Sequence, residues 1–126
     1  MRTLTLLMLT VVAATGLRED NKTLLKEIVD HVELMLEPRS GINLDQYVKH
    51  VFPEEGCSAK HFCQAGKVIT NRDLSFTMLR RRLFAYANHS GIRHCSVRTS
   101  QEDKMGVFLT KIKNCCKKLN SRKHPE

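Results

Sequence analysis

The chain has 126 residues, and its 21 lysines and arginines exceed its 13 aspartates and glutamates, so the formal net charge at pH 7 is +8. This length fits a single domain of common size, and the positive charge favours anionic partners such as receptor ectodomains, sulfated glycans, membranes or nucleic acid. The chain has no Trp and only 6% aromatic residues, which argues against a surface that stacks the bases of single-stranded nucleic acid.

The N-terminal residues have the pattern of a secretory signal peptide. Arg2 supplies a positive charge, Leu4–Ala14 is an apolar run, and small residues up to Gly16 suit a signal peptidase. The run is shorter than the roughly 20 apolar residues that span a membrane, and no later segment could act as an anchor. We therefore expect residues 1–16 to be removed and residues 17–126 to form a secreted extracellular domain that does not insert into a membrane.

The segment from Asn21 to Glu37 has the strongest helical pattern in the chain. Pro38 predicts its end, because proline cannot continue the helical hydrogen bonds. Residues 38–56 contain a second proline and the pair Ser40-Gly41, so they predict a long connection with a helical turn or a short strand. The apolar residues that recur at helical spacing and predict a buried face are Leu25, Ile28, Val29, Val32, Met35 and Leu36.

Two further amphipathic segments follow. Residues 58–70 predict a helix capped by Ser58, and residues 74–88 predict another that Asp73 caps and Gly91 ends. The residues expected to face inward are Phe62, Ala65, Val68 and Ile69 in the former and Leu74, Met78, Leu79, Leu83, Phe84 and Ala87 in the latter.

The last predicted helix covers residues 100–120. Ser100 and Asp103 have the spacing of a capping box, with Asp in place of the usual Glu. Its inward residues are expected to be Met105, Phe108, Leu109, Ile112, Cys116 and Leu119.

Four helices joined by a long, a short and a fairly long connection predict an all-α bundle. Short connections join antiparallel neighbours, whereas parallel neighbours need crossovers. Helices of about 15 residues are roughly 22 Å long, and a connection of about ten residues reaches at most roughly 33 Å, so both longer connections can cross the bundle. The expected fold is a short-chain four-helix bundle with up-up-down-down topology and crossover loops, the topology of helical cytokines.

The chain has five cysteines, namely Cys57, Cys63, Cys95, Cys115 and Cys116. In an exported chain of this size most cysteines pair, and the odd number means that one thiol stays free or forms an intermolecular bond. In the up-up-down-down arrangement, the start of the second helix and the ends of the third and fourth helices lie at one pole. All five cysteines are therefore expected to gather at that pole, where they could pair.

Two N-glycosylation sequons are also consistent with a secreted protein. Asn21-Lys22-Thr23 and Asn88-His89-Ser90 make Asn21 and Asn88 candidate glycosylation sites if they are exposed.

Four segments resemble the interleukin-4/interleukin-13 cytokines, especially the fish-type members. They are similar to the family's first helix, its second-helix motif, the segment after its third helix and its fourth helix: Thr23–Val29, His61–Ile69, Gly91–Val97 and Phe108–Lys113. The second-helix motif is an aromatic residue followed by Cys, Ala and a pair of aliphatic residues. The resemblance implies a cytokine of type 2 immune regulation that brings together an interleukin-4 receptor alpha-like chain and a second receptor chain.

The resemblance also implies a disulfide between Cys63 and Cys95. Cys57 would then pair with Cys115 or Cys116, and Cys115 is slightly favoured because Cys116 shares the apolar stripe with Ile112. The third disulfide of mammalian interleukin-4 has no counterpart here.

Receptor contacts follow from the same resemblance. In the family, a carboxylate on the first helix and a basic cluster on the third helix contact the shared receptor chain. Glu27 matches the carboxylate, and the nearest basic cluster is Arg80, Arg81 and Arg82. Phe84 stands where an ungapped alignment places the family's main arginine, so the cluster as a whole is the candidate. The planar fork of arginine pairs well with carboxylates.

A secreted basic ribonuclease-like enzyme is the main alternative of another class. None of the six histidines lies in a motif that supplies a partner base and an oxyanion site, and there is no Gly-rich phosphate loop, GxSxG or HExxH. Zinc could be bound by His61 with Cys63 and by His94 with Cys95, but an oxidising compartment favours disulfides. We therefore expect no catalytic residue, no metal site and no cofactor.

Two binding functions also remain as alternatives. Another short-chain cytokine, similar to interleukin-3 or interleukin-5, would have the same fold. A heparin-binding protein would use the basic end of the fourth helix, which comprises Lys111, Lys113, Lys117, Lys118, Arg122 and Lys123.

Overall fold

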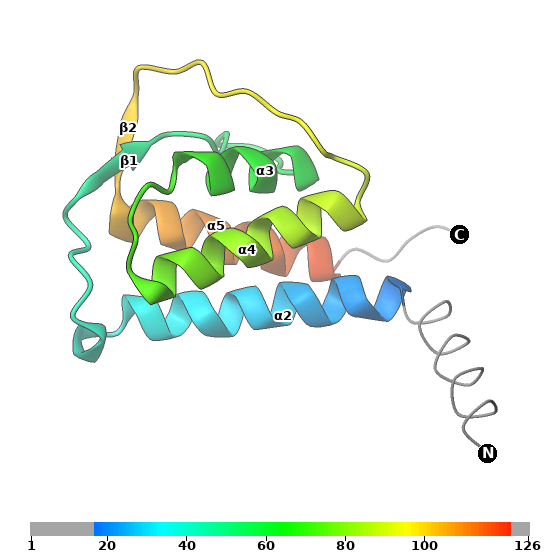
Figure 1. The fold of residues 1–126 in the computed structure, drawn as a ribbon, viewed down its shortest axis with the longest axis horizontal. Helices are drawn as coiled ribbons and strands as arrows, with labels where there is room; N and C mark the ends of the chain where they lie inside the picture. Colours follow the sequence, from blue (N-terminus) through cyan, green and yellow to red (C-terminus); the bar gives the residue numbers. More distant parts are fainter. Residues whose placement is uncertain (1–16, 122–126) are drawn as a thin grey trace.

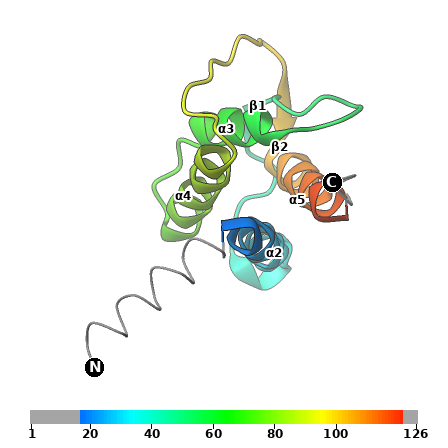
Figure 2. The same ribbon diagram turned by 90° about the vertical axis from the view of Figure 1, so that its right-hand side faces the viewer.

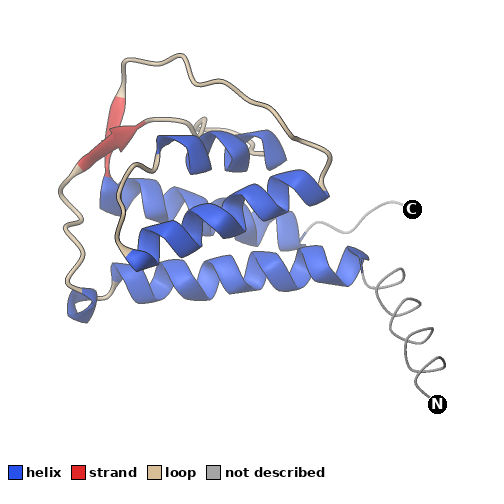
Figure 3. Cartoon of the chain, viewed as in Figure 1, coloured by secondary structure: helices blue, strands red, loops and turns tan. Residues whose placement is uncertain are grey.

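The computed structural model describes residues 17–121, which are mainly helical (Figures 1 and 3). The predicted signal peptide, residues 1–16, lies outside this range, as do Arg122 and Lys123. The helices are α2 (Leu17–Leu36), α3 (Ala59–Val68), α4 (Leu74–His89) and α5 (Met105–Ser121), with a 3-10 turn η1 (Pro38–Ser40) and two short strands, β1 (Tyr47–Lys49) and β2 (Glu102–Lys104). None of these helices combines the length and the apolar character needed to cross a bilayer.

The helix ends follow local sequence signals. α2 ends at Leu36, just before Pro38, which begins η1, and Gly41 ends that turn with a φ of 74°. Ser58 is the N-cap of α3, and its backbone N–H donates to Nδ1 of His61 at 3.0 Å. α4 begins after Asp73, as predicted, but the Asp73 side chain makes no capping hydrogen bond.

The start of the last helix was predicted wrongly. Residues 102–104 form β2, which pairs antiparallel with β1, so that Asp103 lies opposite Val48. Oδ2 of Asp103 is 2.9 Å from Nδ1 of His50 instead of capping a helix. Pairing with β1 provides hydrogen-bond partners for the backbone of residues 102–104, so the helix begins only at Met105. Residues 38–56, predicted to hold a helical turn or a short strand, contain both η1 and β1.

The helices surround one core (Figure 2). α2 packs against α4 and α5, and α3 packs against α4. Phe52, from the connection before α3, lies between α3 and α5, with ring centroids 6.4 Å from Phe62 and 6.1 Å from Phe108. The ring of Phe62 also lies 4.8 Å from that of Tyr86 on α4. Aromatic rings therefore pack together in the core where α3, α4 and α5 meet the connection before α3.

The core contains most of the residues predicted to face inward, with two errors on α4. Leu74 and Met78 are 74% and 38% exposed, whereas Phe76 is fully buried and Tyr86 is 9% exposed. The large ring of Phe76 defines the inward face, which leaves Leu74 and Met78 on the side of the helix. The buried residues of the helices are Leu25, Ile28, Val32, Met35, Phe62, Cys63, Ala65, Gly66, Phe76, Leu79, Leu83, Tyr86, Ala87, Met105, Phe108, Leu109, Ile112, Cys115 and Cys116.

The contact between α3 and α4 depends on Gly66. A Cβ at this position would lie 2.8 Å from Cε1 of Phe84, whereas a Cβ at Gly106 would lie 3.5 Å from Cβ of Leu44, an ordinary contact. Gly66→Ala should lower the free energy of unfolding by about 1 kcal/mol, because the cost of overpacking exceeds the gain in helix propensity. Gly106→Ala, the matched control, should leave it unchanged or raise it by up to about 1 kcal/mol. Urea unfolding measures both, and a Gly66→Ala protein more stable than the parent would contradict this account of the contact.

Candidate functional site

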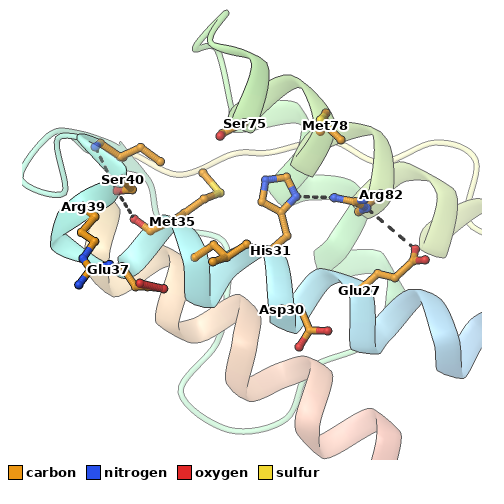
Figure 4. A pocket seen from close by; sticks show the side chains of 12 residues that line it. Glu27, Asp30, His31, Met35, Glu37, Arg39, Ser40, Ser75, Met78 and Arg82 are labelled. Carbon is orange, nitrogen blue, oxygen red and sulfur yellow. Dashed lines mark hydrogen bonds and ion pairs between the residues drawn. The ribbon is translucent and has the colours of Figure 1, made fainter.

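A groove of about 580 Å³ lies between α2 and α4 and extends to η1 (Figure 4). Each helix lines it with residues three or four positions apart, so each presents a single stripe. The stripe of α2 is Glu27, Asp30, His31 and Leu34, and that of α4 is Ser75, Met78 and Arg82. Leu34 is 64% exposed, whereas the next residue, Met35, also lines the groove but is buried. The groove therefore combines apolar surface with charged groups.

Arg82 joins the two helices across this groove. Its Nη1 lies 2.5 Å from Nδ1 of His31, and its Nε lies 4.0 Å from Oε1 of Glu27 (Figure 4). Because a guanidinium stays protonated and only donates, Nδ1 of His31 must be the acceptor and the imidazole must be neutral. Burial and the charge of Arg82 both lower the pKa of His31, and a hydrogen bond with the backbone of Ser75 opposes them only in part.

The pairing of His31 with Arg82 makes the stability of the domain depend on pH. The pKa of His31 is lowered below its ordinary value of 6.5, so the unfolded chain binds a proton more readily than the folded chain. The stability contributed by neutral His31 is therefore present above about pH 6.5 and is lost as the pH falls through the folded-state pKa. The loss of unfolding free energy between pH 7.5 and pH 5, measured with urea, should be smaller in His31→Gln than in the parent.

His61 provides a control for this measurement. Burial and the charge of Lys60 also lower the pKa of His61. Part of the decrease in unfolding free energy at low pH should therefore remain in His31→Gln. This decrease should be smaller still in the double variant His31→Gln, His61→Gln. An unchanged pH dependence in His31→Gln would show that the imidazole is not held neutral by Arg82.

The three arginines of the predicted basic cluster do not share one face of α4. Successive helical residues are rotated by about 100°, so the three arginines point in different directions. Only Arg82 lines the groove. Arg80 is half-buried, Arg81 is exposed, and neither forms an ion pair with another described residue. Of the predicted receptor-contact residues, the structure thus brings together Glu27 and Arg82.

Two disulfides connect the cysteines, Cys57–Cys115 and Cys63–Cys95. These are the expected pairings, and Cys115 is the partner chosen between the two adjacent candidates. Cys116 is a free, buried thiol, and burial raises its pKa to about 12. Since a thiolate is the reactive species, burial and the raised pKa disfavour reaction of this thiol at neutral pH.

The two candidate glycosylation sites lie near each other at one end of the molecule. Asn21 is half-buried on α2, and its Oδ1 is 3.3 Å from Nδ1 of His89 on α4. Asn88 is exposed in the last turn of α4. Asn88 is therefore the more accessible of the two side chains.

A second polar cluster lies between β1, β2 and α5. The carboxylate of Asp103 accepts a hydrogen bond from Nζ of Lys111 at 3.2 Å and contacts Nδ1 of His50 at 2.9 Å. Burial raises the pKa of Asp103, but the hydrogen bonds and charges of His50 and Lys111 outweigh it and leave the pKa below its ordinary value. These contacts hold the strand pair against α5, which indicates a structural role.

The sequence alone did not single out Asp30 and His31 on α2, or Ser75 and Met78 on α4, as residues of this site. One signal was available: Glu27, Asp30, His31 and Leu34 follow the i, i+3, i+4, i+7 pattern on one edge of the apolar face.

Comparison with protein-family models, with curated proteins and with solved structures finds no match to this chain.

Proposed function

We propose that this protein is a secreted short-chain helical cytokine that acts by binding two cell-surface receptor chains and bringing them together. The observation that carries the proposal is the groove in which Glu27 on α2 and Arg82 on α4 lie 4.0 Å apart. The resemblance to interleukin-4 and interleukin-13 assigns an acidic residue of the first helix and a basic residue of the third helix to the first receptor chain. The groove brings one residue of each kind to a single surface.

The proposal includes an up-up-down-down bundle. The link of residues 69–73 is short, which favours antiparallel packing of α3 and α4. In Figure 1, α2 begins at the right and ends at the left, whereas α4 and α5 begin at the left and end at the right. The connections before α3 and after α4 are long enough to cross the bundle. These features together support the topology of helical cytokines.

Secretion is supported by two observations of different kinds. Residues 1–16 have the pattern of a signal peptide. The disulfides Cys57–Cys115 and Cys63–Cys95 suit an oxidising compartment, because cytosolic thiols are kept reduced.

The groove has the composition of an interface hot spot. Leu34 and Met78 offer exposed apolar surface beside the charges of Glu27 and Arg82. A receptor that covers these apolar side chains would remove water from the charged pair, and this strengthens each hydrogen bond that the pair makes to the receptor. In this arrangement α2 and α4 bind the first receptor chain, while α5 and part of α2 recruit the second. The mechanism is association, without a catalytic step.

Two soluble ectodomains test the proposal, an interleukin-4 receptor alpha-like chain and a candidate second chain from the same species. The purified protein should bind the immobilised first ectodomain and then recruit the second ectodomain in a ternary complex. Absence of binding to the alpha-like chain would overturn the interleukin-4/13-like assignment. A ribonuclease assay on the same sample separates the enzymatic alternative, since turnover that rises with protein concentration would contradict a function by association alone.

A further inference from the structure

The exposed side of α3 is covered in part by the connection that follows α4. Residues 90–101 run past α3 and then arch away from it toward β2 (Figures 1 and 2). The Cys63–Cys95 disulfide fixes the middle of this connection to the helix. Nε2 of Gln64 donates to the carbonyl of Ser96 at 2.9 Å, and Nζ of Lys67 donates to the carbonyl of Cys95. These contacts fix the middle of the connection, Cys95 and Ser96, to the helix, with Arg93 and Arg98 two residues to either side.

This surface carries unneutralised positive charge. Lys60, Lys67, Arg93 and Arg98 are all exposed, and none forms an ion pair with another described residue. Neither α3 nor residues 90–101 contain Asp or Glu. Between Gly56 and Gln101 the sequence has eight lysines and arginines but one acidic residue, Asp73. Local acidic side chains are thus not the partners of these cations, and an external polyanion could be.

We infer that these four residues, here called the basic face, form a binding site for a sulfated polysaccharide. A linear polyanion gains affinity by contacting several cations at once and releasing their counterions. Lys60 and Lys67 are seven residues apart on α3, so they lie on the same side of the helix about two turns from each other. Because the disulfide fixes the connection in advance, less conformational entropy is lost when a ligand binds.

The composition of the basic face favours a glycan over the other common polyanions. Residues 90–101 contain no Phe, Tyr or Trp, and Phe62 of α3 is fully buried, so the smaller imidazole rings of His61 and His94 are all that these two segments offer for stacking on a base. The exposed large hydrophobic residues, Leu34, Tyr47, Leu74, Met78 and Val107, all lie outside α3 and this connection. The face therefore lacks the apolar side chains with which an interfacial helix enters a bilayer.

The basic face differs from the basic end of α5, where the sequence alone placed a glycan-binding alternative. In that region Lys111 is already paired with Asp103 at 3.2 Å, and Lys113 is half-buried. The basic face is also separate from the groove, since α3 and α2 lie on opposite sides of the molecule in Figure 2. The inference therefore does not depend on the proposed receptor function.

Binding to a heparin octasaccharide, measured by calorimetry at several salt concentrations, tests the inference. The test variant combines Lys60→Gln, Arg93→Gln and Arg98→Gln, and it keeps Lys67 because that side chain anchors the Cys95 carbonyl. The control variant combines Lys113→Gln, Lys117→Gln and Lys118→Gln, which removes the same number of charges from α5. The test variant should bind about tenfold or more weakly, with a shallower dependence on salt, whereas the control should change little. Circular dichroism checks that both variants remain helical.

Three results would overturn the inference. The control variant could lose as much affinity as the test variant, which would mean that net charge alone governs binding. Desulfated heparin could bind as tightly as the sulfated octasaccharide. Polyuridylate or vesicles of anionic lipid could bind more tightly than heparin, which would assign the surface to nucleic acid or to membranes.

Discussion

Replacing both Cys57 and Cys115 by alanine should lower the free energy of unfolding by about 4 kcal/mol. The two residues are separated by 58 positions in the sequence, so their bond closes a long loop in the unfolded chain and reduces its entropy. The bond also ties the segment before α3 to the last turns of α5. A domain of this size is stable by only about 5–15 kcal/mol in total, so the variant should unfold at a clearly lower urea concentration.

Cys116→Ala is the matched control for this experiment. Cys116 is adjacent to Cys115, but it is free and buried, so its loss leaves both disulfides in place. This substitution should lower the free energy of unfolding by about 1 kcal/mol, because it leaves a small cavity. Peptide mapping without reduction should recover Cys57 linked to Cys115 and Cys63 linked to Cys95, with Cys116 as the free thiol. A Cys57–Cys116 linkage would contradict the disulfide pairing of the structure.

If the proposed function is correct, Glu27→Arg should weaken binding to the alpha-like receptor ectodomain by about thirtyfold or more. The change removes the carboxylate offered to the receptor and places a second positive charge beside Arg82, whose Nε lies 4.0 Å from the present carboxylate. Losing one partner of a desolvated charge pair costs about 2–5 kcal/mol. The dissociation constant, measured with the ectodomain immobilised, reports the effect.

Glu33→Arg provides the same change of charge outside the groove. Glu33 lies on the same helix and is exposed, but it does not line the groove. Its replacement should change affinity by less than about threefold, as expected of a screened surface charge. Arg82→Ala should likewise weaken binding far more than Arg81→Ala. Equal effects of Glu27→Arg and Glu33→Arg would show that overall charge, and not the groove, governs binding.

The sequence predicted the helical fold because its signals are local. Apolar spacing located all four described helices, and Pro38 and Ser58 marked helix ends through their own backbone chemistry. The prediction failed where a distant segment competed with a local pattern. The spacing of Ser100 and Asp103 fits a capping box, but pairing with β1 more than fifty residues earlier in the chain turned residues 102–104 into a strand.

The candidate site was predicted only in part. Glu27 was predicted as a receptor contact from the family resemblance. The basic receptor contact could not be assigned to one residue, because three consecutive arginines were equally good candidates. Only the packing of α4 against α2 selected Arg82, because helical rotation points Arg81 to solvent. His31 looked like an ordinary polar residue beside the apolar stripe, and its neutral state depends on burial and on an arginine 51 positions away.

The sequence by itself therefore determined which segments are helical, which residues form most of the core, and that most of its cysteines would pair. The tertiary structure decided which arginine meets the carboxylate, and it decided that residues 90–101 form a basic surface with α3. The physical reason is the range of the interactions. Helix periodicity and capping act over a few residues, whereas the groove and the basic face depend on contacts between segments distant in the chain, of which Lys67 with Cys95 is one.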